Sequence, residues 1–411
     1  MKKFNKFLSV AVASAMVMAM AGCGNTDNGS AATGTNAATE SAAASDSAAA
    51  SDSAASGSVF KIGGIGPTTG GAAVYGLAVQ HGAEIAVEEI NAAGGINGYQ
   101  VEFKFQDDEA DAEKSVNAYN ALKDWGAQVL DGSTTSGACI AVTDKTKEDN
   151  MFQITPSGSA VECVQYDNNF RVCFSDPNQG LASAQYIGEN GLAEKIAVIY
   201  DSSDVYSSGI YEKFVKEAEN QPFEVVAAEA FTADNKTDFS VQLQKAKDAG
   251  ADMVFLPIYY QESALILTQA AAMGYAPKWF SCDGMDGILG GVDNFDVSLT
   301  EGVMLLTPFA ADATDDLTQS FVTKYKEKYG ETPNQFAADS YDAIYVIKAA
   351  IEKSGVTPDM SVSDICDGMK AAMTEITVDG LTGNGMTWTA DGEANKAPKA
   401  VVIENGAYKA M

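Results

Sequence analysis

Short apolar runs alternate with longer amphipathic stretches from residue 59 almost to the end of the chain. Each apolar run has the length of a strand, and the amphipathic stretches repeat their apolar residues at helical spacing. After the run at 59–65, for example, Val79, Ala83, Ala86 and Ile90 fall on one helix face. Strands that alternate with helices indicate parallel sheets. The pattern restarts at about residue 170, so we predict two α/β lobes with several crossings of the chain between them.

Two loops of this pattern, at 131–137 and 154–159, are rich in Ser, Thr and Gly, and each follows a predicted strand. A helical pattern begins directly after the first loop. Such loops present unpaired backbone N–H groups and short hydroxyls at a positive helix end, which suits an anionic group. They also lie at the carboxyl ends of strands, where ligands of open α/β sheets bind. The alternative is that these residues are ordinary helix caps.

The residues before the first strand have the character of an export signal and a linker. Lys2, Lys3 and Lys6 precede an apolar run at 7–20, which is too short to span a bilayer. The run ends in Met20-Ala21-Gly22-Cys23, which resembles a bacterial lipoprotein signal (residues 1–22) with Cys23 as the acylated residue. Plain secretion is the alternative. Residues 23–58 then form a small-residue linker that we expect to stay disordered and to tether the protein to the cell membrane.

Charge and cysteine usage exclude several classes of function. The chain has 26 basic and 56 acidic residues, a net charge of −30, which argues against nucleic-acid binding. No Cys-x-x-Cys pair is present, so no metal site is expected. Cys163 and Cys173 flank a polar turn and are candidates for a disulfide; buried free thiols are the alternative. The single histidine, His81, shares a helix face with acidic residues, which disfavours a Ser-His-Asp hydrolase.

Several short motifs together carry a family resemblance. These are Ile65-Gly66-Pro67 with Thr69-Gly70-Gly71 and Tyr75-Gly76, the run 90–98, Asp107-Asp108, Ile154-Thr155-Pro156, the run 339–343 and Gly380-Leu381-Thr382-Gly383. In their order and spacing, over about residues 60–403, the chain resembles the ABC-transporter solute-binding proteins of the leucine/isoleucine/valine-binding family.

The resemblance implies the type I periplasmic-binding-protein fold, in which two doubly wound parallel-sheet lobes joined by three crossovers close on a ligand. One lobe would comprise residues 59–175 and 306–390, and the other 176–305 and 391–411. The implied function is an extracytoplasmic receptor that captures a branched-chain or other small neutral amino acid. It would deliver this ligand to an ABC permease with its ATPase subunits. Such a receptor is no enzyme and needs no cofactor. The alternative is a same-fold receptor for urea, short amides or aromatic acids.

The resemblance also implies which residues contact the ligand. Ser136, Ser157 and Ser159 would bind the α-carboxylate, and Asp283 would accept the ammonium group. The local sequence by itself favours a turn residue before Gly at Asp283, and the resemblance reverses that interpretation. Tyrosines at three family positions would flank the ligand, or else lie half-buried at a lobe surface: Tyr75, Tyr206 and Tyr259.

Overall fold

The computed structural model describes residues 57–411. The predicted signal peptide, Cys23 and all but the last two residues of the predicted linker lie outside the described residues. None of the described helices is both long and apolar enough to cross a lipid bilayer.

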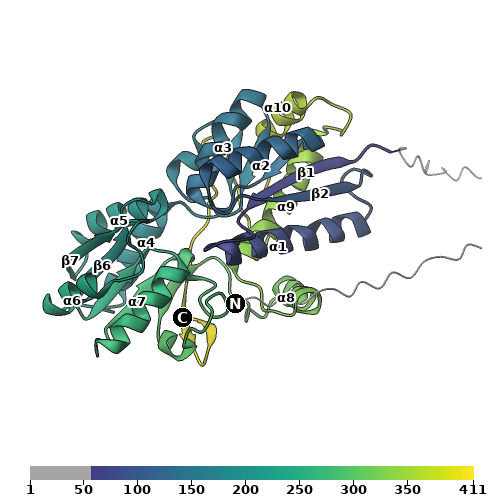
Figure 1. Cartoon of the computed structure of the whole chain (residues 1–411). Helices are drawn as coiled ribbons and strands as arrows, with labels where there is room; N and C mark the ends of the chain where they lie inside the picture. Colours follow the sequence, from purple (N-terminus) through teal and green to yellow (C-terminus); the bar gives the residue numbers. More distant parts are fainter. Residues whose placement is uncertain (1–56) are drawn as a thin grey trace, which may run out of the picture. The chain divides into compact units, whose positions relative to one another are not determined.

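The first sheet has five parallel strands in the order β2-β1-β3-β4-β5 (Figure 1). Their bounds are β1 (Phe60–Gly66), β2 (Val101–Asp107), β3 (Val129–Asp131), β4 (Phe152–Thr155) and β5 (Asn169–Arg171). The elements associated with this sheet are α1 (Ala73–Ala92), α2 (Ala112–Trp125), α3 (Ser136–Asp149), the short 3₁₀ helix η1 (Val161–Val164), α9 (Gln335–Ser354) and α10 (Val362–Met373). The predicted apolar face of α1 is buried, as the helical spacing of Val79, Ala83, Ala86 and Ile90 requires.

The second sheet has seven strands in the order β12-β11-β10-β9-β8-β6-β7. Their bounds are β6 (Lys195–Asp201), β7 (Glu224–Phe231), β8 (Met253–Leu256), β9 (Lys278–Ser281), β10 (Met304–Thr307), β11 (Lys399–Glu404) and β12 (Ala407–Ala410). The remaining elements are α4 (Asp176–Glu189), α5 (Val205–Ala218), α6 (Ser240–Asp248), α7 (Tyr260–Ala272), η2 (Asp283–Met285), η3 (Val297–Thr300) and α8 (Asp316–Tyr329), of which α8 packs on α1. The chain passes between the two sheets after β5, after β10 and after α10.

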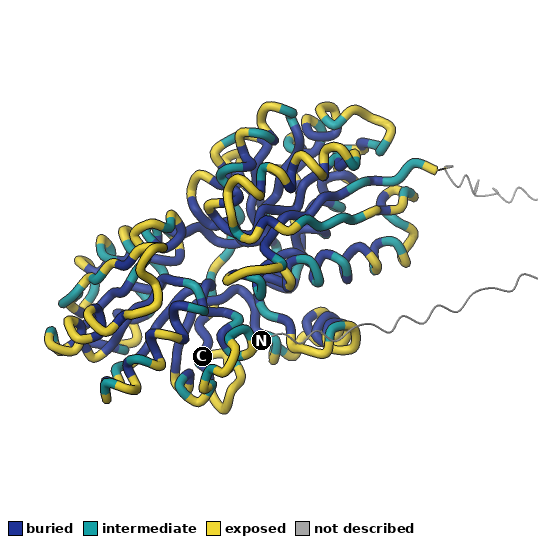
Figure 2. Tube along the Cα trace, viewed as in Figure 1, coloured by how far each residue is buried: buried dark blue, intermediate teal, exposed yellow. Residues whose placement is uncertain are grey.

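The α/β class and the three crossings are confirmed, with one correction to the all-parallel expectation. Strands β6 to β10 are parallel, whereas β11 runs antiparallel to β10 and pairs with β12, a strand that was not predicted. Asn405 and Gly406 have φ angles of 53° and 72°, the left-handed region that a tight hairpin turn requires. The central strands of both sheets are buried, and the exposed residues gather on helices and loops (Figure 2).

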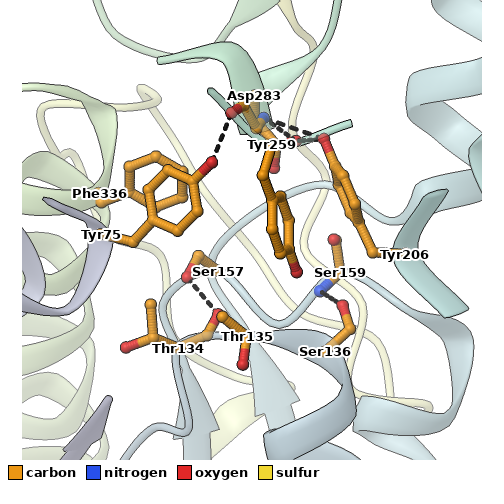
Figure 3. A pocket seen from close by; sticks show the side chains of 11 residues that line it. Tyr75, Thr134, Thr135, Ser136, Ser157, Ser159, Tyr206, Tyr259, Asp283 and Phe336 are labelled. Atoms are coloured by element: carbon orange, nitrogen blue, oxygen red, sulfur yellow. Dashed lines mark hydrogen bonds between the residues drawn. The ribbon is translucent and has the colours of Figure 1, made fainter. Parts of the chain in front are cut away.

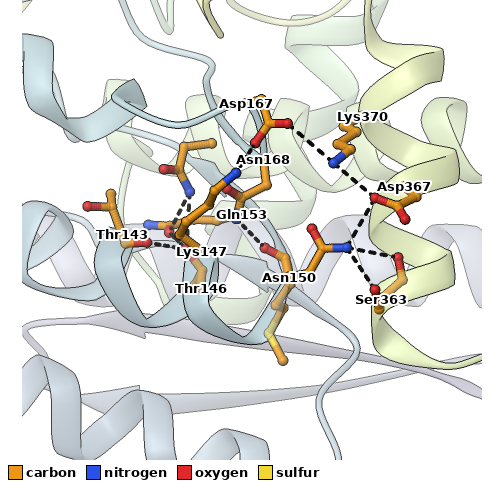
Figure 4. A network of polar contacts seen from close by, with 12 residues as sticks. Thr143, Thr146, Lys147, Asn150, Gln153, Asp167, Asn168, Ser363, Asp367 and Lys370 are labelled. Atoms are coloured by element: carbon orange, nitrogen blue, oxygen red, sulfur yellow. Dashed lines mark hydrogen bonds and ion pairs between the residues drawn. The ribbon is translucent and has the colours of Figure 1, made fainter.

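Helix α10 is fastened to the first sheet by polar contacts, although it lies more than 200 residues further along the chain. The Asn150 amide donates to Ser363 Oγ (2.8 Å) and Asp367 Oδ1 (3.0 Å), and Asp167 bridges Lys147 and Lys370 (Figure 4). The returning part of the chain is thereby held against the segments that lead into β4 and β5, at the edge of the sheet opposite the two Ser/Thr/Gly loops.

Candidate functional site

A single cavity is lined by all seven residues that the sequence predicts to contact a ligand. Figure 3 shows the hydroxyl-rich loops of the first sheet facing tyrosines and a carboxylate from the second sheet. The predicted residues are Tyr75, Ser136, Ser157, Ser159, Tyr206, Tyr259 and Asp283. The sequence prediction missed four further lining residues: Thr134, Thr135, Gly284 and Phe336. That any of these lining residues contacts a ligand is a prediction.

The floor of the cavity is the N-terminal end of α3, which starts at Ser136 directly after the loop that follows β3. Gly132 in this loop has φ 142°, and a Cβ there would lie 2.7 Å from the Ile65 carbonyl oxygen, so the position requires glycine. The N-cap residue Thr135 makes no capping hydrogen bond through its side chain. This helix end therefore keeps its positive partial charge and its N–H groups for an anion.

The serines of the two loops have different tasks. Ser136 Oγ accepts hydrogen bonds from the backbone N–H groups of Ser159 and Ala160, both at 3.1 Å, which leaves its proton available to a ligand. The Ser157 hydroxyl donates to the Thr134 carbonyl (2.6 Å), so it fastens one loop to the other. By contrast, Thr135 Oγ1 and Ser159 Oγ are buried and have no hydrogen-bond partner.

Arg171 holds the second loop from behind. Its guanidinium is fully buried and donates to the carbonyl groups of Ser159 and Ala160, and it forms an ion pair with Glu393 at 3.3 Å. The Trp388 indole N–H donates to the Arg171 carbonyl (2.8 Å). Arg171 therefore shapes the loop and does not line the cavity.

The roof of the cavity is the segment Asp283-Gly284 after β9. Asp283 Oδ1 accepts from the Tyr206 hydroxyl (2.6 Å) and from the Gly284 N–H (2.8 Å). Burial raises the pKa of Asp283 to about 6, although these hydrogen bonds work against that shift. A Cβ at Gly284 would lie 2.6 Å from the Tyr206 hydroxyl, so a glycine is needed to let the two approach.

Aromatic rings form the walls. The Tyr75 hydroxyl donates to the Gly284 carbonyl (2.5 Å) and accepts from the Tyr260 N–H (3.2 Å), so a residue of α1 is bonded to loops of the second sheet. The Tyr75 ring lies 4.4 Å from that of Phe336, and the Tyr206 and Tyr259 rings lie 5.1 Å apart. The Tyr259 pKa is raised well above its ordinary value by burial and by nearby carboxylates, so its hydroxyl stays protonated.

These side chains leave a cavity of about 10 Å³. That is the space of roughly one water molecule. A larger ligand therefore enters only when the two sets of loops separate or the tyrosine rings turn away.

The cysteines do not pair as the sequence suggested. Cys163 and Cys173 are both free and buried. The reason is that η1 directs Cys163 toward α3, where its thiol donates to the Ser136 carbonyl (3.7 Å) and packs with Cys139, whereas Cys173 lies beyond β5.

Other candidate centres have structural explanations. Within residues 57–411, no group of three His, Cys, Asp or Glu side chains is arranged to hold a metal ion. His81 stacks on the Tyr329 ring at 3.7 Å. Asp107 accepts hydrogen bonds from Thr68 and Thr69 and so closes its own loop.

Comparisons with known proteins show the family to which the chain belongs. Residues 59–407 match the profile of a family described as "Periplasmic binding protein". "Leu/Ile/Val-binding protein homolog 3" of Brucella melitensis is 31% identical over 300 residues, which are 72% of this chain and 80% of that protein. The leucine-, isoleucine-, valine-, threonine-, and alanine-binding protein of Pseudomonas aeruginosa is 30% identical over 302 residues, 72% of this chain and 78% of that one.

The fold comparison points the same way. LivJ of Streptococcus pneumoniae, a branched-chain amino acid transporter substrate-binding protein crystallised in complex with isoleucine, has a TM-score of 0.77 and 29% sequence identity to this chain. The match covers 86% of this chain and 98% of LivJ.

Proposed function

The chain belongs to the periplasmic binding protein family, and from that premise we propose that it is an extracytoplasmic solute-binding receptor of an ABC importer. The ligand we propose is a branched-chain or other small neutral amino acid, captured between the loops of the two sheets. Family members bind small solutes for transport, so the protein is a receptor and not an enzyme.

One observation carries this proposal: groups that bind an anion lie on one side of the cavity, and a group that binds a cation lies on the other. Hydroxyls and helix N–H groups gather on the first-sheet side around Ser136, and a buried carboxylate, Asp283, lies on the second-sheet side. An α-amino acid has a carboxylate and an ammonium group that fit these two sides. The aromatic walls suit a small apolar side chain.

The relatives support the same ligand class. The Pseudomonas aeruginosa protein is named for leucine, isoleucine, valine, threonine and alanine, and the Streptococcus pneumoniae protein was crystallised with isoleucine. These ligands share the α-amino acid head group and a small uncharged side chain.

We further propose how the receptor works in place. The lobes 59–175 with 306–390 and 176–305 with 391–411 close on the ligand, and the closed form presents both lobes to the permease and, through it, the ATPase subunits. Cys23, acylated after removal of residues 1–22, anchors the receptor to the cell membrane through the linker.

A thermal-shift screen of the purified protein tests the ligand class. The panel is the twenty amino acids, urea, short amides and aromatic acids. A ligand present at 1,000 times its Kd adds about 4 kcal/mol to the free energy of unfolding, which is an easily measured shift. We expect shifts from small neutral amino acids.

The variants Asp283→Asn and Ser136→Ala then test the site. Asp283→Asn leaves an ammonium group without its charged partner, so it weakens amino-acid binding by about 2–5 kcal/mol. Unchanged affinity in Asp283→Asn contradicts the proposed ammonium site. Shifts only from urea, amides or aromatic acids contradict the amino-acid proposal and favour the same-fold alternative.

A further inference from the structure

Arg171 is the only arginine of the chain, and its guanidinium is fully buried behind the ligand cavity. Its Nε has no hydrogen-bond partner. Moving a charged group out of water is costly, and an apolar side chain of similar size in its place is often as stable or more so. Stability alone is therefore a weak reason for this buried charge, and the contacts of the guanidinium indicate a second one.

The guanidinium contacts the far side of the same peptide groups that hold Ser136. Its Nη1 donates to the carbonyl oxygens of Gly158 (3.4 Å) and Ser159 (2.5 Å). The nitrogens of these two peptide groups belong to Ser159 and Ala160. Both N–H groups donate to Ser136 Oγ at 3.1 Å, and Figure 3 shows the first of these bonds. Two peptide groups therefore connect Arg171 with one hydroxyl.

All the dipoles of this connection point the same way. The positive guanidinium lies at the carbonyl end of each peptide group, which polarises the group and makes its N–H a stronger donor. Ser136 Oγ receives both N–H groups, and an oxygen that accepts hydrogen bonds donates its own proton more strongly. Ser136 lines the cavity, so this proton is offered to the ligand. The effect of a positive charge thus reaches the hydroxyl-rich side, although no basic side chain lines the cavity.

The segment that crosses between the sheets after α10 holds Arg171 in place and partly neutralises it. The Arg171 N–H donates to the Gly392 carbonyl (3.0 Å), and the Arg171 carbonyl accepts from the Trp388 indole. Within residues 57–411, Glu393 is the only carboxylate that forms an ion pair with the guanidinium, and its side chain is 34% exposed and so partly screened. Asp176 also lies within electrostatic range, but burial raises its pKa well above the ordinary value, which favours its neutral form. The guanidinium therefore keeps an excess of positive charge on its loop side.

We infer that Arg171 is a positioning residue for the ligand carboxylate: its charge strengthens the Ser136 hydroxyl as a donor through two peptide groups, and Glu393 sets how much of that charge acts. The inference rests on the proposed function and deepens it, because it names what favours a charged carboxylate over a neutral head group. A merely structural arginine would support the loop equally for every ligand.

The test compares two ligands that differ only at the carboxyl group. L-leucine and L-leucinamide share the ammonium group and the side chain, but the second carries a neutral amide in place of the carboxylate. Both are titrated by calorimetry at about pH 6.5, below the pKa of an α-amino group. If the thermal-shift screen selects another small neutral amino acid, that ligand and its amide are used.

The proteins titrated are the wild type, Arg171→Met, Glu393→Gln and Asp391→Asn. Asp391 is a matched control because it is an exposed acid of the same segment, and Glu393, two residues further on, is the one that pairs with Arg171. Asp391→Asn therefore changes the net charge as Glu393→Gln does and leaves the ion pair intact.

We expect Arg171→Met to lower the affinity for L-leucine by about tenfold or more and that for L-leucinamide by less than about threefold. Glu393→Gln should raise the affinity for L-leucine by about threefold, because the guanidinium loses its counter-charge. The same variant should have a lower thermal midpoint without ligand, because a buried charge has lost its partner. Tighter binding by a less stable protein is a result that a merely structural role does not give. Asp391→Asn should change neither quantity.

Three results overturn the inference while the proposed function stands. Equal losses for the two ligands in Arg171→Met would make the arginine a structural support of the loop. Unchanged or weaker binding of L-leucine by Glu393→Gln would show that the charge does not reach the site, and this variant decides the question if Arg171→Met fails to fold. An equal gain in Asp391→Asn would assign the effect to net charge. A wild-type protein that binds no small neutral amino acid overturns the proposed function and this inference together.

Discussion

At the scale of single residues, side chains of the same type contribute to the cavity in different ways. The hydroxyls of Ser136 and Ser157 form hydrogen bonds that join the two loops. The hydroxyls of Thr135 and Ser159 are buried and have no hydrogen-bond partner. The first pair shapes the site, and the second pair is ready for a ligand. Sequence alone identified the loops, but it could not separate these roles because both kinds of residue occur in the same short motif.

Ser136→Ala should therefore reduce stability as well as binding. The substitution leaves the N–H groups of Ser159 and Ala160 buried without an acceptor, so the free energy of unfolding should fall by roughly 1–3 kcal/mol, measured by urea denaturation without ligand. Thr135→Val is the matched control: it removes a hydroxyl that bonds to no protein group and keeps the shape, so it should change stability by less than about 0.5 kcal/mol. Equal losses in the two variants would contradict these roles.

At the scale of secondary-structure elements, the helix starts decide which side chains reach the site. Because Pro177, Asn178 and Gly180 are common turn residues, the sequence favours a loop over 176–180 before the next helix. In the structure α4 starts at Asp176, with Ser175 as the N-cap and the proline in the first turn, where its missing N–H does no harm. Asp176 and Gln179 therefore lie in the first turn of α4 and not in a loop. Phe336 carried no local signal at all, since only the return of α9 brings it to the cavity.

The contact between α3 and α10 provides a test at this scale. Asn150 ends α3 with φ 47° and donates hydrogen bonds to Ser363 and Asp367. Asn150→Ala loses these bonds and also places alanine in the left-handed region, so we expect a loss of about 1–2 kcal/mol in the free energy of unfolding.

Asn150→Gly separates the two contributions to this loss. Glycine tolerates the same φ angle, so this variant loses only the hydrogen bonds and should be more stable than Asn150→Ala by up to about 1 kcal/mol. A glycine variant less stable than the alanine variant would show that backbone strain at residue 150 is unimportant.

At the scale of the whole molecule, the alternation of strands and helices was sufficient to predict two α/β lobes and the edge at which ligands bind. Apart from Phe336 on α9, the lining residues of the cavity follow β1, β3, β4, β6, β8 and β9, all at carboxyl ends of parallel strands. Which loops of the two sheets face each other was not readable from local pattern, and here the family resemblance supplied the seven predicted residues. Edge strand β12 was missed because its four residues show no apolar alternation.

Buried carboxyl groups spread over both sheets predict how stability depends on pH. Burial raises the pKa to about 6 for Asp108, Asp204 and Asp339 and to about 7 for Asp131. In the unfolded chain these groups titrate near 3.9. The folded state therefore binds more protons between about pH 4 and 7, so the free energy of unfolding should decrease as the pH rises through this window.

Thermal unfolding at pH 5 and pH 8, at one high ionic strength that screens surface charge, measures this effect. The midpoint should be higher at pH 5. His81 opposes this trend, because burial lowers its pKa and the unfolded chain therefore binds the proton more tightly than the folded protein does. It is one group against these four carboxyl groups and Asp283. Asp131→Asn should flatten the dependence. A midpoint that rises from pH 5 to pH 8 would contradict the assignment.

The separation of the cavity into a hydroxyl-rich side and a carboxylate side has an evolutionary consequence. The hydroxyl-rich side depends on main-chain groups and on the buried Arg171, which donates hydrogen bonds to the carbonyl groups of the second loop. Few single mutations therefore alter this side without damaging the fold. The second side consists of exchangeable side chains at helix starts and on one short segment. New ligand preferences should therefore arise by substitution of the side chains on the second-sheet side, while the proposed carboxylate-binding side stays the same.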